Sequence, residues 1–319
     1  MLRYLGFALI ALMALGLTAG IAVVLLRSLP ERQAMRLTVF DGVAAVGGDA
    51  PRLRAMLEDA DTGKPILFTR LVVRFSHGWT DHTWSSSGGL SVSLGPTGLS
   101  AGPHDYTVGL SEMDFRLDVC SHGTVWVLPA DTPVVWFDAA AICPMGEGAA
   151  AAPLGEGGGM PTPLLRGHAL DKGEIMPSER RAGHATRENQ DSPPREVVDA
   201  VKTLAAGRQA VYLIDADAAG YASVRQRLAG LRMPPGPAYW VRPGDEPARL
   251  QGLKQVWPRV EGAVVSAPAI AAAVERLRVR TSLVPRAGGP EPRAAVIGAW
   301  SDAVLRLSVV AAATATKEK

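Results

Sequence analysis

Cysteine is scarce in this 319-residue chain, which has two, Cys120 and Cys143. Two cysteines exclude a disulfide-rich scaffold and any zinc site built from four thiolates. The sequence leaves open whether the pair forms one bridge or stays as two unpaired thiols.

The chain also lacks a large excess of either charge, because 33 Lys and Arg nearly balance 31 Asp and Glu and leave a net charge of +2. A protein that neutralises a run of phosphates needs a basic excess, so we expect no nucleic-acid partner. Hydrophobic residues make up 47% of the chain and charged ones 20%, which excludes a disordered chain and fits two folded domains plus a membrane segment. Glycine (34) and proline (24) are plentiful, which predicts many turns and a loose segment.

The longest apolar run is residues 4–26, which lie without a charge between Arg3 and Arg27. At 1.5 Å per residue these 23 residues match a hydrocarbon core of about 30 Å. No A-x-A-like cleavage site precedes Arg27, so the run predicts an uncleaved membrane anchor in residues 1–30. We therefore expect a single-pass membrane protein that contacts the membrane through residues 4–26.

Residues 31–130 alternate short period-2 stretches with turn signals, as in an all-β sandwich. Alternate residues of a strand point to opposite faces, so each stretch predicts one buried face. The residues expected inward are Leu71, Val73 and Phe75; Leu90, Val92 and Leu94; and Tyr106, Val108 and Leu110.

The motifs DADTGKP (59–65), VVRF (72–75), GLSVSL (89–94) and PHDYTV (103–108) give this stretch a family likeness. It resembles bacterial immunoglobulin-like modules, which implies a spacer or binding module without chemistry of its own. The resemblance favours an extracytoplasmic, periplasmic location for the body of the protein. The arginines that follow the apolar run favour the cytoplasmic side by the positive-inside rule, so sidedness stays open.

The segment HGWTDH allows a metal-site interpretation with His77, Asp81 and His82 as ligands. Against it, one loop without a second ligand cluster has nothing to hold such ligands about 2 Å from an ion. Trp79 and Trp84 of the same region either form an aromatic contact surface or fold back over the sandwich.

Residues 131–319 change pattern to alternating strands and helices, which predicts an α/β domain with a doubly wound, mainly parallel sheet. A continuous apolar run ends at Asp138, as expected of a strand buried on both faces. Ligands of such sheets bind beyond the carboxyl ends of the strands, so we expect Asp138, Asp215, Asp217 and Ser266 at that edge, the last three as candidate binding residues. The expected strands are 134–138, 210–215, 238–242, 262–266 and 280–284, and the expected helices are 194–207, 220–231, 246–257, 270–277 and one from residue 294.

Within this domain AVYL, GYA, RQRL and MPPGP follow one another, and LKQVWPRVEGAV and VRTSLVP continue the pattern. This order of motifs resembles the haloacid-dehalogenase-like phosphatases, in particular their lipin-type or phosphatidate-phosphatase-like branch. In that family the first strand ends in D-x-D-x-T, where one Asp attacks the phosphoryl group and the other is a general acid and base with Mg²⁺.

The resemblance implies altered chemistry in this chain. It places a vestigial nucleophile at Asp138, whereas Ala140 stands at the acid/base position. Ile214 replaces the phosphate-holding Thr or Ser, and Ser266 falls where a metal-binding acid is expected. Lys254 is the residue that can stand for the basic partner of phosphate and nucleophile.

A rival register takes AVYLIDADAAG as the nucleophile motif, with Asp215 and Asp217 as its carboxylates. Ala219 at the Thr position and the short remaining chain speak against it. Two further interpretations stay open: Asp138 and Asp215 form a rebuilt cation-binding pair, or Asp215 and Asp217 cap the next helix. We expect no metal or other cofactor. If a metal does bind, we expect Asp138 and Asp215 to be its ligands.

Residues from about 144 to 193 predict a long, flexible insertion of mixed charge. In the family that this domain resembles, a flap or cap over the active site stands at this point of the chain. The insertion is therefore either a flexible substitute for that lid or a degraded remnant of it.

From these patterns we expect a bacterial, membrane-anchored, haloacid-dehalogenase-like protein that has lost catalysis and acts in binding or assembly with a protein partner. The alternative is a divergent Mg²⁺-dependent phosphatase, using Asp138 on a phosphomonoester or phosphatidate-like substrate. A third reading is a surface adhesin built on residues 36–130.

Overall fold

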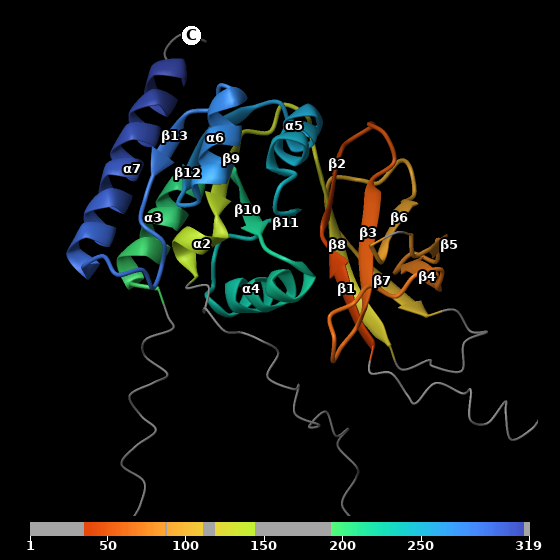
Figure 1. Cartoon of the computed structure of the whole chain (residues 1–319). Helices are drawn as coiled ribbons and strands as arrows, with labels where there is room; N and C mark the ends of the chain where they lie inside the picture. The colour runs from red at the N-terminus through yellow and green to blue at the C-terminus, as the bar shows by residue number, and fades with distance from the viewer. Residues whose placement is uncertain (1–34, 87, 111–118, 144–192, 316–319) are drawn as a thin grey trace, which may run out of the picture.

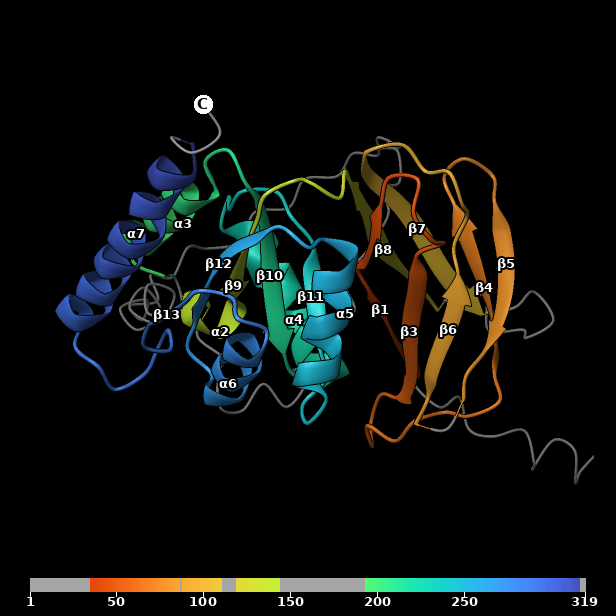
Figure 2. The same ribbon diagram turned by 90° about the horizontal axis from the view of Figure 1, so that it is seen from above.

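The structure, a computed structural model, describes residues 35–86, 88–110, 119–143 and 193–315. Its strands form two sheets in a β half and one sheet, flanked by helices, in an α/β half (Figure 1). The two halves lie side by side in both views (Figures 1 and 2).

The β half is a sandwich of a three-stranded and a five-stranded sheet. The first has the order β1 (Met35–Phe40), β3 (Arg52–Asp59), β6 (Leu90–Leu94), and the second β2 (Gly42–Ala45), β8 (Cys120–Leu128), β7 (Gly102–Leu110), β4 (Arg70–Phe75), β5 (Thr80–Trp84). All pairs are antiparallel except β2 and β8, which run parallel. Leu57, Leu71 and Val125 are fully buried between the sheets.

Strand β6 faces the opposite way from the sequence prediction. Val92 and Leu94 are 48% and 59% exposed, whereas Ser91 and Ser93 are buried. Edge strand β5 lies close to β6, where Ser93 Oγ donates to Asp81 Oδ2 at 2.6 Å. The small serines fit inward at this closed edge because larger side chains would collide with the neighbouring strand.

The α/β half is built on one five-stranded parallel sheet, with the first strand in the chain at its centre. Its order is β11 (Ala238–Val241), β10 (Gln209–Asp215), β9 (Val134–Asp138), β12 (Val260–Val265), β13 (Thr281–Leu283). The described helices are α2 (Ala139–Ile142), α3 (Arg195–Ala205), α4 (Ala218–Gly230), α5 (Glu246–Val256), α6 (Pro268–Arg276) and α7 (Arg293–Ala315).

Helices cover both faces of this sheet, which makes three layers (Figure 2). Helices α3, α4 and α7 pack on one face and α5 and α6 on the other, as the two core clusters show. Helix α3 illustrates why: Val197, Val201 and Leu204 recur at helical spacing and are fully buried.

The β half has a core of its own, and one cluster of the α/β half also includes Phe40 and Met56 of the β half. Phe40, at the end of β1, stacks on Trp240 of β11 with 4.0 Å between ring centroids. On the other side of the sheet, Trp257 Nε1 donates to the carbonyl oxygen of Ala44 at 3.0 Å. Through these contacts the β half packs directly against the α/β half.

The fold class predicted from the sequence is wrong, because it placed a transmembrane helix ahead of an immunoglobulin-like sandwich and a doubly wound sheet. Within residues 35–86, 88–110, 119–143 and 193–315, no helix is long and apolar enough to cross a membrane. The longest described helix, α7, carries Arg293, Asp302 and Arg306. Its Trp300 is buried in the domain core.

The predicted localisation, a periplasmic single-pass membrane protein, is wrong for the same reason, because it required a membrane-spanning helix and the described residues contain none. The anchor expected at residues 4–26 and the insertion at 144–192 lie outside the described residues. The two cysteines are both free, Cys120 exposed and Cys143 buried.

Candidate functional site

Asp138 ends the central strand β9 and is the residue around which the carboxyl edge of the sheet is organised. The strands on either side, β10 and β12, also end at this edge, and the turn after β12 brings Ser266 to it. Asp138 is fully buried.

Both oxygens of the Asp138 carboxylate are occupied by protein donors. Oδ1 accepts from the Ala140 backbone N–H at 3.0 Å, which makes Asp138 the N-cap of α2. Oδ2 accepts from Ser266 N–H (2.9 Å), Ser266 Oγ (2.8 Å) and Ala267 N–H (2.8 Å). The carboxylate therefore joins β9 and α2 to the turn that leads into α6.

This arrangement has a direct chemical consequence. An attacking carboxylate needs an oxygen that reaches the substrate, whereas each Asp138 oxygen is buried and engaged. Ala140, which the resemblance aligns with the general acid and base, supplies a backbone N–H and no titratable group. The residues present hold a carboxylate in place and do not activate it.

Lys254 lies at the other edge of the sheet. Its ammonium donates to the carbonyl oxygen of Leu277 at 2.6 Å, at the C-terminal end of α6. Helices that follow parallel strands end at the amino edge of the sheet. Lys254 is therefore placed away from Asp138 and stabilises the last turn of α6.

Leu213 of β10 pairs with Asp138 at the end of β9. Asp215 therefore lies two residues further along β10, beyond the end of β9. Its Oδ1 is buried and accepts no hydrogen bond from the described residues. Desolvation by burial raises the pKa of Asp215, the negative charges of Glu246 and Asp138 raise it further, and Arg286 lowers it. The folded protein thus carries an unfavourable negative charge at this edge.

Asp217 has a structural contact of its own. Its Oδ1 accepts from the Gly220 backbone N–H at 2.7 Å, so it is the N-cap of α4. This contact is the capping role that the sequence left open for it.

The carboxylates at this edge offer Mg²⁺ few free oxygens, although Asp215 Oδ1 has no hydrogen-bond partner among the described residues. A magnesium ion needs an octahedron of oxygens, including one or two free carboxylates. The Asp138 oxygens already accept four hydrogen bonds, and Glu246 Oε1 accepts from Gly244 N–H at 2.7 Å. Among the residues that the structure describes, no three His, Cys, Asp or Glu side chains are grouped to hold a metal.

Replacing Asp215 by Asn tests the electrostatic strain at this edge. Because the folded pKa of Asp215 is raised, the charged form destabilises the fold above that pKa, and the penalty disappears as pH falls towards the unfolded value. We expect Asp215→Asn to unfold at a higher temperature than the wild type at pH 7, with the difference shrinking towards pH 4. A variant that is less stable than the wild type at pH 7 would contradict this; Asp217→Asn, which touches only the cap of α4, serves as the comparison.

The three residues of the HGWTDH metal hypothesis make separate contacts. His77 stacks on Phe75 with 5.4 Å between centroids, and Asp81 accepts from Ser93. His82 lies on β5 opposite Val72. Of the two tryptophans, Trp79 packs edge-on against Phe75 and Trp84 is 60% exposed.

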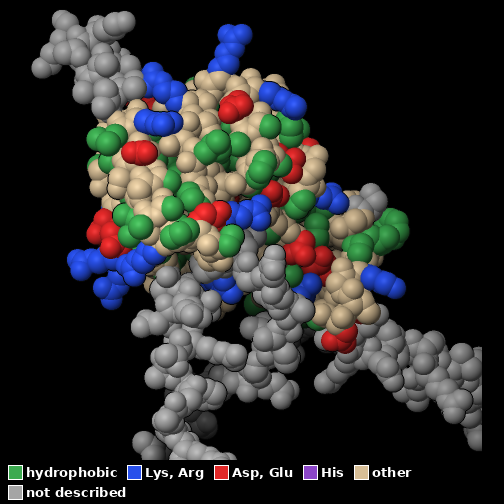
Figure 3. Space-filling model, turned by 60° about the vertical axis from the view of Figure 1, so that its left-hand side comes forward, with side chains coloured by type: hydrophobic (Ala, Val, Ile, Leu, Met, Phe, Trp, Pro, Cys, Tyr) green, Lys and Arg blue, Asp and Glu red, His purple; other side chains and the backbone are tan. Residues whose placement is uncertain are grey.

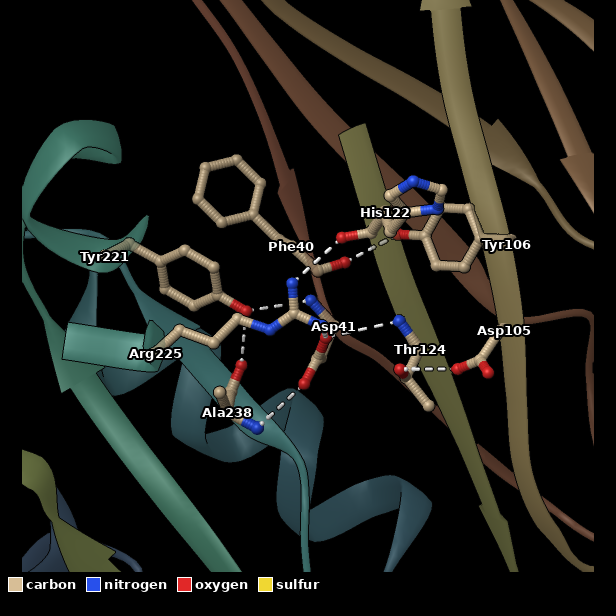
Figure 4. A network of polar contacts seen from close by, with 9 residues as sticks. All are labelled: Phe40, Asp41, Asp105, Tyr106, His122, Thr124, Tyr221, Arg225 and Ala238. Carbon is tan, nitrogen blue, oxygen red and sulfur yellow. Dashed lines mark hydrogen bonds and ion pairs between the residues drawn. The ribbon is translucent and has the colours of Figure 1, made fainter. Parts of the chain in front are cut away.

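A second buried carboxylate, which the sequence patterns did not single out, lies between the two halves of the molecule (Figure 4). Asp41 follows β1 and forms a 2.9 Å ion pair with Arg225 of α4. Its oxygens also accept from the N–H groups of Thr124 on β8 (3.2 Å) and Ala238 on β11 (3.0 Å). One side chain therefore binds strands of both halves.

Tyrosine and arginine contacts extend this network. Tyr221 Oη accepts from Asp41 N–H at 3.0 Å and donates to the Ala238 carbonyl at 2.8 Å, and Arg225 donates to the His122 carbonyl at 2.9 Å (Figure 4). Burial raises the pKa of Asp41, while Arg225 and the backbone donors oppose this. No sequence pattern marks these residues, since they lie about 180 positions apart.

Comparisons with known proteins give little to add to this geometry. No protein-family model matches the chain. No curated protein matches it. Among solved structures it is similar to a carbohydrate acetylesterase from Xanthomonas citri, with 14% identity over 86% of this chain and 67% of that one and a TM-score of 0.29. A score this low carries no argument about fold or activity.

Proposed function

We propose that this chain is a haloacid-dehalogenase-like protein without phosphatase activity, which acts by binding a partner or ligand. The observation that carries the proposal is the Asp138 carboxylate, which accepts four protein hydrogen bonds and has no exposed surface. The residue that the resemblance makes the nucleophile is used here to hold loops together.

The surroundings of Asp138 support the same proposal. The acid/base position is Ala140, the lysine that could neutralise charge bonds to Leu277, and the place of a metal-binding acid is taken by Ser266, which donates to Asp138. Loss of a general acid alone typically costs 10²- to 10⁴-fold in rate. The alternative of a Mg²⁺-dependent phosphatase has no such support from the donor set.

Three large apolar side chains of the β half are exposed, Phe68 (79%), Trp84 (60%) and Leu94 (59%). Single exposed apolar side chains are ordinary on protein surfaces, so they mark candidate contact residues and do not by themselves define a binding patch.

The proposal is tested by phosphatase assays of the full chain with Mg²⁺, against p-nitrophenyl phosphate and a phosphatidate. We expect turnover no higher than that of Asp138→Asn, because the wild-type carboxylate does not reach a substrate. Asp217→Asn is the matched control, since it removes one carboxylate charge at the same edge. Turnover that is lost in Asp138→Asn and kept in Asp217→Asn would refute the proposal.

A further inference from the structure

Strand β1 has one free edge, and part of that edge is open. The strand pairs with β3 on one side only. Past the end of β1 the other side is closed, because Asp41 N–H donates to Tyr221 Oη of α4 at 3.0 Å (Figure 4). Main-chain groups of alternate strand residues point to the same side, so those of Leu37 and Val39 face α4 as well. Among the described residues, these groups have no hydrogen-bond partner on that side.

A groove of about 300 Å³ lies between this edge and helix α4. Leu37 and Val39 border the groove with main-chain atoms, because their side chains are part of the sandwich core. On the opposite wall Ala222 and Ala229 of α4 are exposed and small, which leaves room beside the strand. The groove therefore presents main-chain donors and acceptors at a width that side chains do not fill.

Thr38 adds a polar side chain to the same groove. It lies between Leu37 and Val39, lines the groove and is only 3% exposed. Its Oγ1 is buried and has no hydrogen-bond partner among the residues that the structure describes. A buried hydroxyl without a partner is unfavourable, and a rotation about χ1 brings it to a polar group in the groove.

Other strand edges of the molecule are closed by side chains, as is usual for edges that must not pair with other chains. Thr83 Oγ1 of β5 donates to the Val92 carbonyl of β6 at 3.0 Å, and Asp41 accepts from Ala238 N–H on edge strand β11 at 3.0 Å. On the face shown in Figure 3, apolar, acidic and basic side chains of the described residues are intermixed, so it presents no patch of one kind. The edge of β1 is thus a place where main-chain pairing is available.

Size and charge define what the groove accepts. A helix about 10 Å wide exceeds this volume within a single turn, whereas one extended chain is thinner. The charged lining residue is Arg225, and Asp41 neutralises it at 2.9 Å, so the groove favours an uncharged segment. A sheet edge of a second copy would bring its next strand, about 4.8 Å away, against α4.

We propose that an extended, uncharged segment of a partner protein binds in this groove as an added strand beside β1. Its main chain pairs with Leu37 and Val39, and a Ser or Thr side chain of the segment bonds to Thr38. In this mode main-chain hydrogen bonds supply affinity and alternate side chains supply specificity. The proposal names the partner class for the binding role proposed above and rests on that role.

The test is amide hydrogen exchange of the full chain, followed by NMR, with a capped seven-residue peptide of alternating Thr and Val as the probe. We expect exchange at Leu37 and Val39 to slow about tenfold or more when the peptide binds, and exchange at Thr38, which faces β3, to stay unchanged. Two further peptides carry N-methyl groups on one or the other set of alternate amides. Only the set that faces β1 should abolish binding.

Variants of the protein locate the site. Ala222→Leu fills the groove and should weaken binding about tenfold or more, whereas Ala272→Leu, at an exposed alanine of α6, is the matched control and should change nothing. Thr38→Val should weaken binding about threefold and raise the melting temperature of the free protein, because it removes the unpartnered hydroxyl.

The outcomes separate the two proposals. Absence of peptide binding, or binding unchanged in Ala222→Leu, overturns the groove and leaves the proposed function standing. Equal binding of all three peptides overturns strand pairing. Protection of Leu37 and Val39 without peptide, or a dimer that Ala222→Leu dissociates, means that the chain itself fills the edge and overturns the partner. Phosphatase turnover lost in Asp138→Asn overturns the proposed function and leaves the groove in place.

Discussion

Replacing Asp138 by Ala is expected to lower the free energy of unfolding by about 4 kcal/mol. The substitution removes the acceptor of four donors, the buried N–H groups of Ala140 and Ala267 and the part-buried N–H and O–H groups of Ser266. Buried N–H and O–H groups without acceptors cost about 1–3 kcal/mol each, and water that enters the small space recovers part of this. Urea unfolding followed by tryptophan fluorescence measures the loss.

Two milder substitutions show whether the hydrogen bonds are the cause. Asp138→Asn keeps an acceptor for the Ser266 and Ala267 donors but turns an amide N–H₂ towards the Ala140 N–H, so about 2 kcal/mol is expected. Ser266→Ala removes one donor and leaves the carboxylate accepting from three, so about 1 kcal/mol is expected. If Asp138→Ala stays within about 1 kcal/mol of the wild type, the carboxylate is not a structural clamp, and the observation that carries the proposed loss of catalysis loses its weight.

The order of elements in the α/β half could be read from the sequence, because each helix and strand carries its own local signal. The helix expected at 246–257 is found at Glu246–Val256, and the strand expected at 238–242 at Ala238–Val241. Apolar runs with Pro or Asp at helix starts mark such elements without reference to the rest of the fold.

The β half was harder to predict for a physical reason. Period-2 alternation predicts which residues share a face but not which face is inside when both carry small or medium side chains. In β6 the large Val92 and Leu94 point outward, because Ser91 and Ser93 suit the narrow space beside β5. No strand was predicted by itself at residues 35–59 or 120–128, although apolar and polar residues alternate in β1 from Met35 to Val39.

Two residues at the carboxyl edge of the sheet, Asp138 and Ser266, could be selected from the sequence, but their contact could not. The resemblance selects Asp138 and Ser266, yet only the structure brings the Ser266 hydroxyl and N–H to the Asp138 carboxylate. The contact joins residues 128 positions apart, and no local pattern encodes it.

Asp41→Ala is expected to lower the free energy of unfolding by about 3 kcal/mol, because it removes the side chain that both halves of the molecule bind. The variant leaves the Thr124 and Ala238 N–H groups without their acceptor and separates Arg225 from its partner. Arg225 is 32% exposed and regains water, so the loss stays below that of a fully buried pair.

Asp105→Ala is the matched control for this prediction. Asp105 is an exposed carboxylate near this network; among the described residues its hydrogen bond is the one that it accepts from Thr124 Oγ1 at 2.9 Å, within the β half (Figure 4). Its removal should cost no more than about 0.5 kcal/mol. Denaturation followed by far-ultraviolet circular dichroism and by tryptophan fluorescence compares the two variants. Equal losses would mean that Asp41 contributes no more than a surface contact, and that the Phe40 and Trp257 packing alone holds the halves together.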